Sequence, residues 1–507
     1  MTAARLRASA SGALVLMFAL LAWRFASFLN LGWNAVRWPF EIDYAEGIVW
    51  QQAEMIFSRG AYGAIDGFPT IVFHYTPLYH GLVSALSAMT GWDMLYTGRG
   101  VSIAATLAVA ALAGTITARA APAQVTGRGR LMMAAGSGLA LFALYPVVLS
   151  GLVMRVDLLA VVFSLSGLWL GLKAYQRPGL IHGAALCFVA AVFTKQSVIA
   201  APAALFGVML LLRPRLALTG IATCIVTGLA ALLSFNMLTD GGFVRHIFLY
   251  NINRIDWGRL LLVPRIAAMH TPLIVAALLA VSFRLAEMRT RRYGQPWRSI
   301  ADDGNDLAWV TIRVYLLTTS LTLITVAKVG SFVNYLIEWT IVIALIAGCG
   351  LASAVRAVQQ KTESDAPDMR AVLGAVVIPV MIGVHALTFQ GPDIASKWTA
   401  DKFAAMQALS ARVRAADKPI ISDEMVLVRR SGKQVVWEPM IFVELASTGI
   451  WDERSFVQRI RNQEFAMFIT TTSEHDWSPA VRSAMEAAYP MQDSVNHYTV
   501  RLPKDEK

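Results

Sequence analysis

The fold is decided by stretches such as SGALVLMFALLAWRFASFLN, residues 11–30, in which Arg24 is the one charged residue. The hydrocarbon core of a bilayer accommodates about 20 apolar residues of helix. Ten further apolar runs lie near residues 101–118, 131–150, 158–175, 180–194, 198–212, 217–235, 266–283, 308–327, 333–352 and 371–389. In these runs apolar residues follow one another instead of alternating with polar ones, which favours helices over a membrane β-barrel. We therefore predict a mostly α-helical, polytopic membrane protein with about 11 transmembrane helices.

The composition agrees with a membrane protein. Of 507 residues, 56% are hydrophobic and 15% are charged, whereas soluble domains carry about 25% charged residues. The net charge of +11 fits cytoplasmic loops rich in Lys and Arg better than it fits nucleic-acid binding. Arg5 and Arg7 before an apolar run resemble a signal peptide, but bulky residues stand where a small-residue cleavage site would be needed. We expect this run to be retained as the first helix.

The basic residues predict the topology. Six groups of them, including residues 119–130, 213–215 and 284–298, fall on one side when the runs are threaded in order, and that side is the cytoplasm. The N-terminus is then cytoplasmic and the C-terminus lies outside. The same parity places Arg155, Asp157, Lys195 and residues 328–338 at the outer face.

Two regions differ from simple spans. Residues 31–100 form a first outer loop, in which we expect an interfacial helix over residues 46–59, stopped by Gly60, and a short re-entrant or interfacial helix over 76–89. After the membrane domain, residues 1–390, the composition becomes that of a soluble protein. Residues 391–507 carry β-like runs at 419–422, 434–437 and 465–471 and a helical pattern at 452–462, which predicts a small outer α/β domain.

The first outer loop carries the sharpest chemical feature, Asp43-Tyr-Ala-Glu46-Gly47. A carboxylate just outside the membrane could act as a general base toward an acceptor hydroxyl. The alternative is structural, because Asp-x-x-Glu at a helix start is typical of an N-cap with a reciprocal Glu. Both can hold, with Glu46 in the cap and Asp43 catalytic.

Other polar residues reach the same face from separate turns. Tyr75, Tyr79 and His80 could line a site or anchor the loop at the interface. Charges near helix ends often extend toward water, but they also mark substrate paths. The candidates for binding a donor phosphate are Arg155, Lys195, Arg254 and Lys328, with Asp157 and Gln196 beside them.

Cations around one carboxylate suit transfer of a sugar from a lipid phosphate. The phosphate is already a good leaving group, so the reaction needs cations to stabilise it and a base for the acceptor. The sequence has no HExxH, Walker A or dinucleotide-binding motif, so it requires no divalent metal or other cofactor and disfavours a soluble nucleotide donor.

With these residues in place, the chain resembles the bacterial GT-C glycosyltransferases of the protein-mannosyltransferase-like and aminoarabinose-transferase-like type. The resemblance covers nearly the whole chain and rests on Asp43-Tyr-Ala-Glu46-Gly47, Tyr75-Thr-Pro-Leu-Tyr79, Gly98-Arg99, Arg155-Val-Asp157, Thr194-Lys195-Gln196, Asn334-Tyr335-Leu-Ile-Glu338, Ile421-Ser-Asp-Glu and Gly449-Ile-Trp-Asp452. Two departures are Thr76-Pro77-Leu78 in place of Pro-Pro-Leu, and first-loop acidic residues that are three apart rather than adjacent.

The resemblance implies a bacterial inner-membrane enzyme with a periplasmic active site. It implies a polyprenyl-phosphate sugar donor, inverting transfer and Asp43 as the base, with a glycan, lipid or protein as acceptor. It adds Arg99, Asn334, Tyr335 and Glu338 to the substrate-binding candidates. The alternatives are a secondary transporter or lipid flippase, for which paired inverted repeats would be expected and none is evident, and a scaffold that presents the outer domain.

Overall fold

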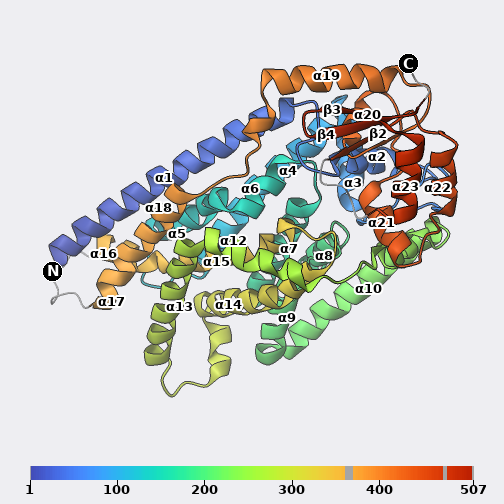
Figure 1. The fold of residues 1–507 in the computed structure, drawn as a ribbon. Coiled ribbons are helices and arrows are strands. Elements are labelled where there is room, and N and C mark those ends of the chain that lie inside the picture. Colours follow the sequence, from blue (N-terminus) through green and yellow to red (C-terminus); the bar gives the residue numbers. More distant parts are fainter. Residues whose placement is uncertain (1, 360–368, 472–476, 505–507) are drawn as a thin grey trace.

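The apolar runs form helices that lie side by side in one elongated bundle (Figure 1). The structure, a computed structural model, describes residues 2–359, 369–471 and 477–504. Among these, seven helical segments are long and apolar enough to cross a membrane: α1 (Ala3–Arg37), α4 (Met94–Arg119), α7 (Asp157–Ala174), α10 (Pro214–Leu238), α13 (Thr271–Arg291), Gly304–Ala327, which includes α14 (Gly304–Thr322), and Val333–Gln359, which includes α15 (Ile337–Gly350) and α16 (Ala352–Gln359).

The remaining predicted spans are shorter or bent. Helices α5 (Gly127–Ala140) and α6 (Tyr145–Leu152) belong to a pair that bends by 71°. Helices α8 (Leu180–Val192) and α9 (Ala200–Leu212) and the segment Leu373–Thr388, which ends in α18 (Ile378–Thr388), are apolar but short. The mostly helical, polytopic fold is thus confirmed, whereas the number of 11 crossings stays a prediction.

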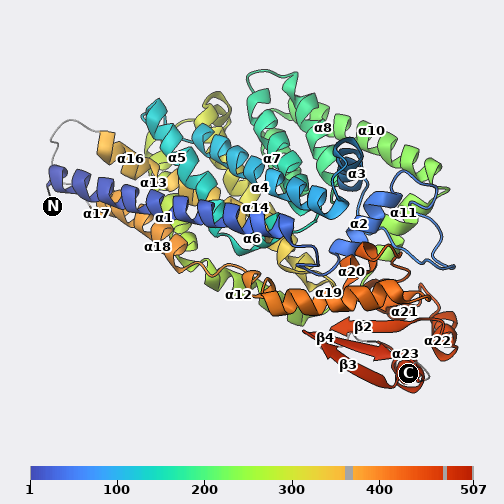
Figure 2. The same cartoon turned by 90° about the horizontal axis from the view of Figure 1, so that it is seen from above.

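The charge within the first apolar run has a structural role. Arg24 donates from Nε to the Ala386 carbonyl at 2.6 Å and from Nη2 to the Phe389 carbonyl at 2.8 Å. The last carbonyls of a helix have no partner within it, so a cation there satisfies them. Arg24 therefore joins the C-terminal end of α18 to α1, and the two helices run side by side (Figure 2).

The basic turns meet at one end of the bundle. The Arg213 guanidinium lies 3.5 Å from the Asp302 carboxylate, and Arg356 lies 3.5 Å from Glu287. Helix α1, with 35 residues, extends roughly 50 Å from this end to the first outer loop. The basic groups and the first outer loop therefore occupy opposite ends of the molecule.

The first outer loop is buried more deeply than expected. Helix α2 (Glu46–Met55) ends four residues before Arg59, so the predicted end near Gly60 is wrong. Eight successive residues of α2, from Glu46 to Ala53, are buried, because the helix packs between α3 (Leu78–Thr90) and α20 (Met425–Arg430). Gly47 is essential to this packing, since a Cβ there would lie 2.2 Å from the Met425 carbonyl carbon.

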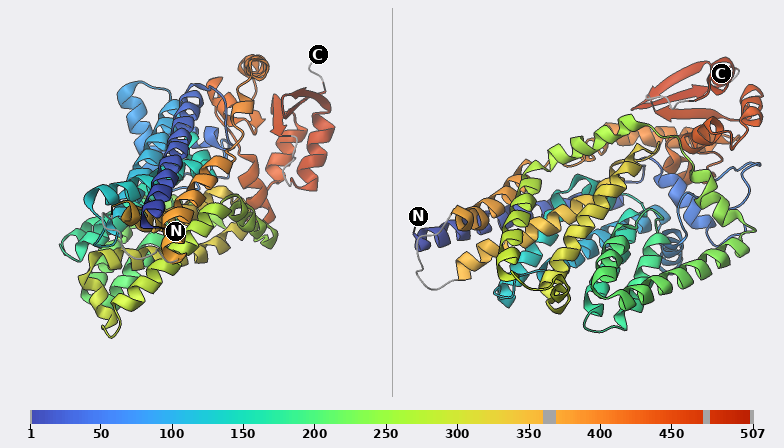
Figure 3. Two further views of the ribbon diagram at one scale, coloured as in Figure 1. Left: turned by 90° about the vertical axis from the view of Figure 1, so that its left-hand side faces the viewer. Right: turned by 90° about the horizontal axis from the view of Figure 1, so that it is seen from below.

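The C-terminal region forms a four-stranded sheet in the order β1 (Ile420–Ser422), β2 (Met467–Thr471), β4 (Tyr498–Leu502), β3 (Met491–Val495). Strands β1 and β2 are parallel and the other pairs antiparallel. Successive side chains point to opposite faces: Ile420 packs with α19 (Ala400–Ala415) and α20, and Ile421 with α21 (Pro439–Ser447), α22 (Arg454–Arg461) and α23 (Pro479–Ala488). Figure 3 shows this layered domain beside one end of the bundle.

Most of the predicted elements of this domain are present. Strands β1 and β2 confirm the runs at 419–422 and 465–471, and α22 confirms the helical pattern at 452–462. The predicted strand at 434–437 is wrong. That segment lies against the first loop instead, where the Thr70 amide donates to the Val436 carbonyl at 2.8 Å.

Candidate active site

The first element of the site is an ion pair at the end of the bundle that carries the first outer loop. The Asp43 Oδ2 atom lies 2.9 Å from Arg155 Nη2, which also donates to the Tyr44 carbonyl at 2.9 Å. The two side chains are 23% and 18% exposed, so the pair is accessible on one side. Burial lowers the pKa of Arg155, but the surrounding carboxylates and Tyr75, with Asp43 the strongest among them, together outweigh burial and the pKa is raised. Arg155 therefore stays charged.

A second pair lies deeper, where α7 begins. The Lys195 ammonium, between α8 and α9, forms an ion pair with the Asp157 carboxylate. Asn334 donates to the same Asp157 oxygen at 3.0 Å, and the Lys195 nitrogen lies 4.9 Å from the centre of the Tyr335 ring. Three turns that are remote in sequence thus meet around one carboxylate.

Tyr75 joins the two pairs into one cluster. Burial raises the pKa of the Tyr75 phenol, and the Asp157 carboxylate adds to this effect, while Arg155 and Lys195 act in the opposite direction. The phenol thus lies within electrostatic reach of both pairs. We call Asp43, Tyr75, Arg155, Asp157, Lys195, Asn334 and Tyr335 the charged cluster.

A small cavity opens beside the charged cluster. Asp157, Lys195, Asn334, Tyr335 and Glu338 line it, together with apolar residues of neighbouring helices. Glu338 accepts hydrogen bonds from Ser164 at 3.1 Å and from Tyr315 at 2.5 Å, so its carboxylate is fixed by the bundle. The cavity provides a partly apolar approach to the Lys195–Asp157 pair.

The Glu46 carboxylate, which was expected to be catalytic or to cap a helix, lies in a fully buried environment. Its side chain is fully buried and pairs with Arg99 at 2.7 Å, and its oxygens also accept from the amides of Ile42 at 2.7 Å and Met154 at 2.8 Å. Burial raises the pKa of Glu46, but the Arg99 charge and the hydrogen bonds that Glu46 accepts together outweigh burial, and the pKa is lowered. Helix α2 has Ala45 at its N-cap with no side-chain cap, so the predicted capping box is wrong.

Arg99 is buried in the same way. Besides Glu46, its guanidinium donates to the carbonyls of Ala35, Trp38 and Phe40 at 2.6 to 2.8 Å. These bonds use its donors to close the turn between α1 and the first loop. Arg99 and Glu46 thus form most of their hydrogen bonds within the first loop and its neighbouring turns.

Tyr79, His80 and Gln196 also support the loop. Tyr79 is fully buried and donates to the Gly98 carbonyl at 3.0 Å. His80 contacts Gln52 at 3.1 Å, and burial lowers its pKa to about 4, so its ring is neutral at pH 7. Gln196 donates to the His74 carbonyl at 2.7 Å, next to Tyr75. The contacts of Tyr79 and His80 are structural, and their substrate-binding role stays a prediction.

Lys328 and Arg254 lie on two loops that are hydrogen-bonded to each other. The Val329 amide donates to the Arg254 carbonyl at 2.9 Å. Arg254 forms an ion pair with Glu444 of α21 at 2.6 Å, which ties this loop to the C-terminal domain. Lys328 is half-buried, burial lowers its pKa, and it forms no ion pair with any residue that the structure describes. Lys328 is thus an available cation.

The C-terminal domain covers this end through groups that sequence reasoning missed. Tyr44 donates to Glu438 at 3.0 Å, and His74 lies 3.4 Å from the other oxygen of Glu438. Tyr145 and Arg265 also belong here, since both Asp43 and Arg265 act electrostatically on Tyr145. Tyr44 follows Asp43 and His74 precedes Tyr75 in the sequence, and this adjacency to predicted site residues could have identified both.

Across residues 2–359, 369–471 and 477–504, no three His, Cys, Asp or Glu side chains converge on a metal site.

The comparisons with known proteins bear on the fold. The sequence matches no family model and none of the curated proteins. The structure is similar to crystal structures of ArnT from Cupriavidus metallidurans, bound to undecaprenyl phosphate (12% identity, 94% of this chain and 97% of that chain, TM-score 0.55) and in the apo state (12%, 95% and 98%, 0.56).

It is also similar to the archaeal oligosaccharyltransferase AglB from Archaeoglobus fulgidus, in complex with an inhibitory peptide and a dolichol-phosphate (10% identity, 95% of this chain and 74% of that chain, TM-score 0.50). At these identities the likeness establishes the fold. The two ArnT structures match over nearly the full length of both chains, including the C-terminal domain. The chain therefore has the GT-C-like fold of these structures.

Proposed function

We propose that this protein is a membrane glycosyltransferase that moves a sugar from a polyprenyl-phosphate carrier to an acceptor hydroxyl at the periplasmic face. The observation that carries the proposal is the charged cluster, in which a partly exposed carboxylate, Asp43, adjoins buried and half-buried cations. The fold supports it, because ArnT, which is similar over 97% of its chain, was crystallised with undecaprenyl phosphate.

Asp43 is the proposed general base. Its carboxylate takes the proton of the acceptor hydroxyl while the acceptor oxygen attacks the anomeric carbon. The bond between that carbon and the phosphate oxygen breaks, and the carrier leaves as polyprenyl phosphate with both bonding electrons. Attack opposite the phosphate inverts the anomeric centre. The contact with Arg155, at 2.9 Å, orients the Asp43 carboxylate for this step.

The cations stabilise the departing phosphate. We assign Lys328, which has no anionic partner among the described residues, as a direct phosphate contact, with Arg155 and Lys195 beside it. Arg254 is tied to Glu444, so its part is to hold the Lys328 loop against the C-terminal domain. Asn334 and Tyr335 fix Asp157 and Lys195.

The membrane orientation and the domain arrangement complete the proposal. Lys and Arg are enriched in cytoplasmic loops, so the end that gathers the basic turns is assigned to the cytoplasm and the charged cluster to the periplasm. Residues 391–507 then form a periplasmic domain above the cluster. Its contacts with Tyr44 and His74 support a role in holding the acceptor.

The test is an assay of carrier release. Purified protein is incubated with a panel of polyprenyl-phosphate sugars and candidate acceptors, and release of polyprenyl phosphate is followed by mass spectrometry. We expect at least one pair to give acceptor-dependent release, which Asp43→Asn abolishes. Proton-gradient-dependent uptake in liposomes without any transfer would instead support the transporter or flippase alternative.

A further inference from the structure

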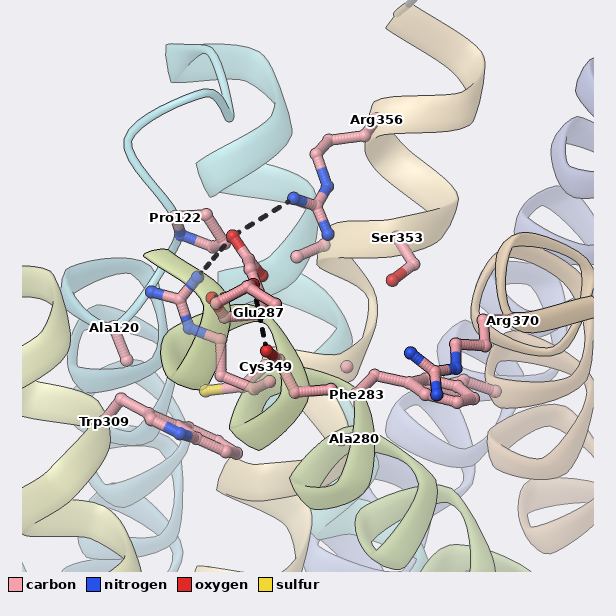
Figure 4. A pocket seen from close by; sticks show the side chains of 16 residues that line it. Ala120, Pro122, Ala280, Phe283, Glu287, Trp309, Cys349, Ser353, Arg356 and Arg370 are labelled. Atoms are coloured by element: carbon pink, nitrogen blue, oxygen red, sulfur yellow. Dashed lines mark hydrogen bonds and ion pairs between the residues drawn. The ribbon is translucent and has the colours of Figure 1, made fainter. Parts of the chain in front are cut away.

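A cavity of about 340 Å³ lies between helices at the end of the bundle opposite the charged cluster (Figure 4). It is bounded by the C-terminal half of α13, by α16 and by the turn that follows α4. One part of the wall is apolar, with Ala280, Phe283 and Ile378. The other part is charged, with Glu287 and three arginines from separate helices: Arg284, Arg356 and Arg370.

The cations of this cavity exceed the anions that the structure places near them. Arg284 is 8% exposed and lies 2.9 Å from both Asp306 and Glu287. Asp306 also pairs with Arg291 and Arg292, which have Asp303 as a second partner, so the three guanidinium groups share two carboxylates besides Glu287.

The arginine N–H donors on the cavity wall accordingly outnumber their acceptors. Glu287 is shared between Arg284 and Arg356, which reaches it only at 3.5 Å. The Arg284 Nε atom is buried with no partner among the residues that the structure describes, and within those same residues Arg370 forms no ion pair. A buried donor without an acceptor is unfavourable, so an anion that accepts from it would be stabilised at this position.

We propose that this cavity binds the phosphate headgroup of an anionic glycerophospholipid. Arginine guanidinium groups pair well with phosphate oxygens, and basic pockets between transmembrane helices on the cytoplasmic side are suited to lipid headgroups. The volume lies within the range of small-ligand sites, about 300–1,000 Å³. The apolar wall of Phe283 and Ile378 accommodates the first methylenes of the acyl chains, which a free phosphate ion would leave unused.

The test compares a cavity variant with a matched control. Arg356→Gln/Arg370→Gln removes two cations from the wall and spares the buried Arg284. Arg128→Gln/Arg215→Gln removes two exposed cations from the same end of the molecule, outside the cavity. Affinity of the full-length protein in detergent micelles for phosphatidylglycerol is measured by native mass spectrometry and by the shift in Tm, with phosphatidylcholine and inorganic phosphate as comparison ligands.

We expect phosphatidylglycerol to bind the wild-type protein and raise its Tm. The cavity variant should lose about tenfold in affinity for each charge-assisted hydrogen bond removed, and the control variant should match the wild type. Equal losses of affinity in both variants would mean that general surface charge binds the lipid, which would overturn the proposal. The same Tm shift with inorganic phosphate or phosphatidylcholine would also overturn the proposal. Because the readout is lipid binding, the result is independent of the proposed transferase activity.

Discussion

Two ion pairs in the first outer loop begin only three residues apart, yet they have opposite environments. Asp43 and Arg155 are 23% and 18% exposed, whereas Glu46 and Arg99 are both fully buried. The distances are similar, 2.9 and 2.7 Å. What differs is the number of donors around each carboxylate, since Glu46 also accepts from two backbone amides. Of these two carboxylates, Asp43 has the exposure that the proposed base requires, while Glu46 bonds to the loop around it.

The largest expected effect is on catalysis by Asp43→Asn. Loss of the base should lower the turnover number by about 10²- to 10⁴-fold, because proton transfer from the acceptor then has no partner. The thermal unfolding midpoint should stay close to that of the wild type, since the pair is partly exposed and exposed pairs contribute little to stability. Turnover in Asp43→Asn equal to that of the wild type would remove Asp43 from the mechanism.

The opposite pattern is expected for Glu46→Gln. This change leaves the Arg99 charge buried without its anion, which should lower the free energy of unfolding by about 3–5 kcal/mol. Denaturant unfolding in detergent measures this loss. Turnover per folded molecule should be retained at low temperature. A stable Glu46→Gln variant with abolished turnover would reverse the assignment of the two carboxylates.

A smaller effect is expected at Lys328. Lys328→Gln should raise the KM for the lipid donor by about tenfold, since one charge-assisted contact to phosphate is lost, while the fold is unchanged. Arg59→Gln removes an exposed cation from the first outer loop and should leave KM unaltered. If both variants raise KM equally, the effect is general attraction of an anionic lipid rather than a contact at Lys328.

The contrast between these residues shows what the sequence could predict. The continuous apolar runs are enough to predict the helices, and the parity of the basic turns is enough to predict that Asp43, Arg155 and Lys195 lie at one end. Both predictions depend only on patterns along the chain. The exposure of each carboxylate does not follow from such patterns. Glu46 is buried because a segment almost 380 residues away, beginning at Met425, packs on α2. Spacing predicted a cap there, and tertiary packing overrode it.

The same packing creates a third environment for a carboxylate, in which the neighbours are anionic. Glu424 accepts from the Glu41 amide at 2.8 Å and from the Tyr498 hydroxyl at 2.6 Å. Burial raises the pKa of Glu424 to about 7, and Glu46 adds to this effect, although Tyr498, the Glu41 amide and Lys397 oppose it. Burial, Glu424 and Glu46 also raise the pKa of Glu41.

This raised pKa gives a pH dependence opposite to that of a salt-bridged carboxylate. The folded protein holds a proton on Glu424 that the unfolded chain releases near its ordinary pKa of 4.5. The free energy of unfolding should therefore fall as the pH rises from about 4.5 to about 7. Glu424→Gln mimics the protonated form and should flatten this part of the profile, with Glu41 as the remaining contributor. If the free energy of unfolding of Glu424→Gln falls with pH as steeply as that of the wild type, the titrating group lies elsewhere. Glu424 would then be ionised in the folded protein, as a salt-bridged carboxylate is.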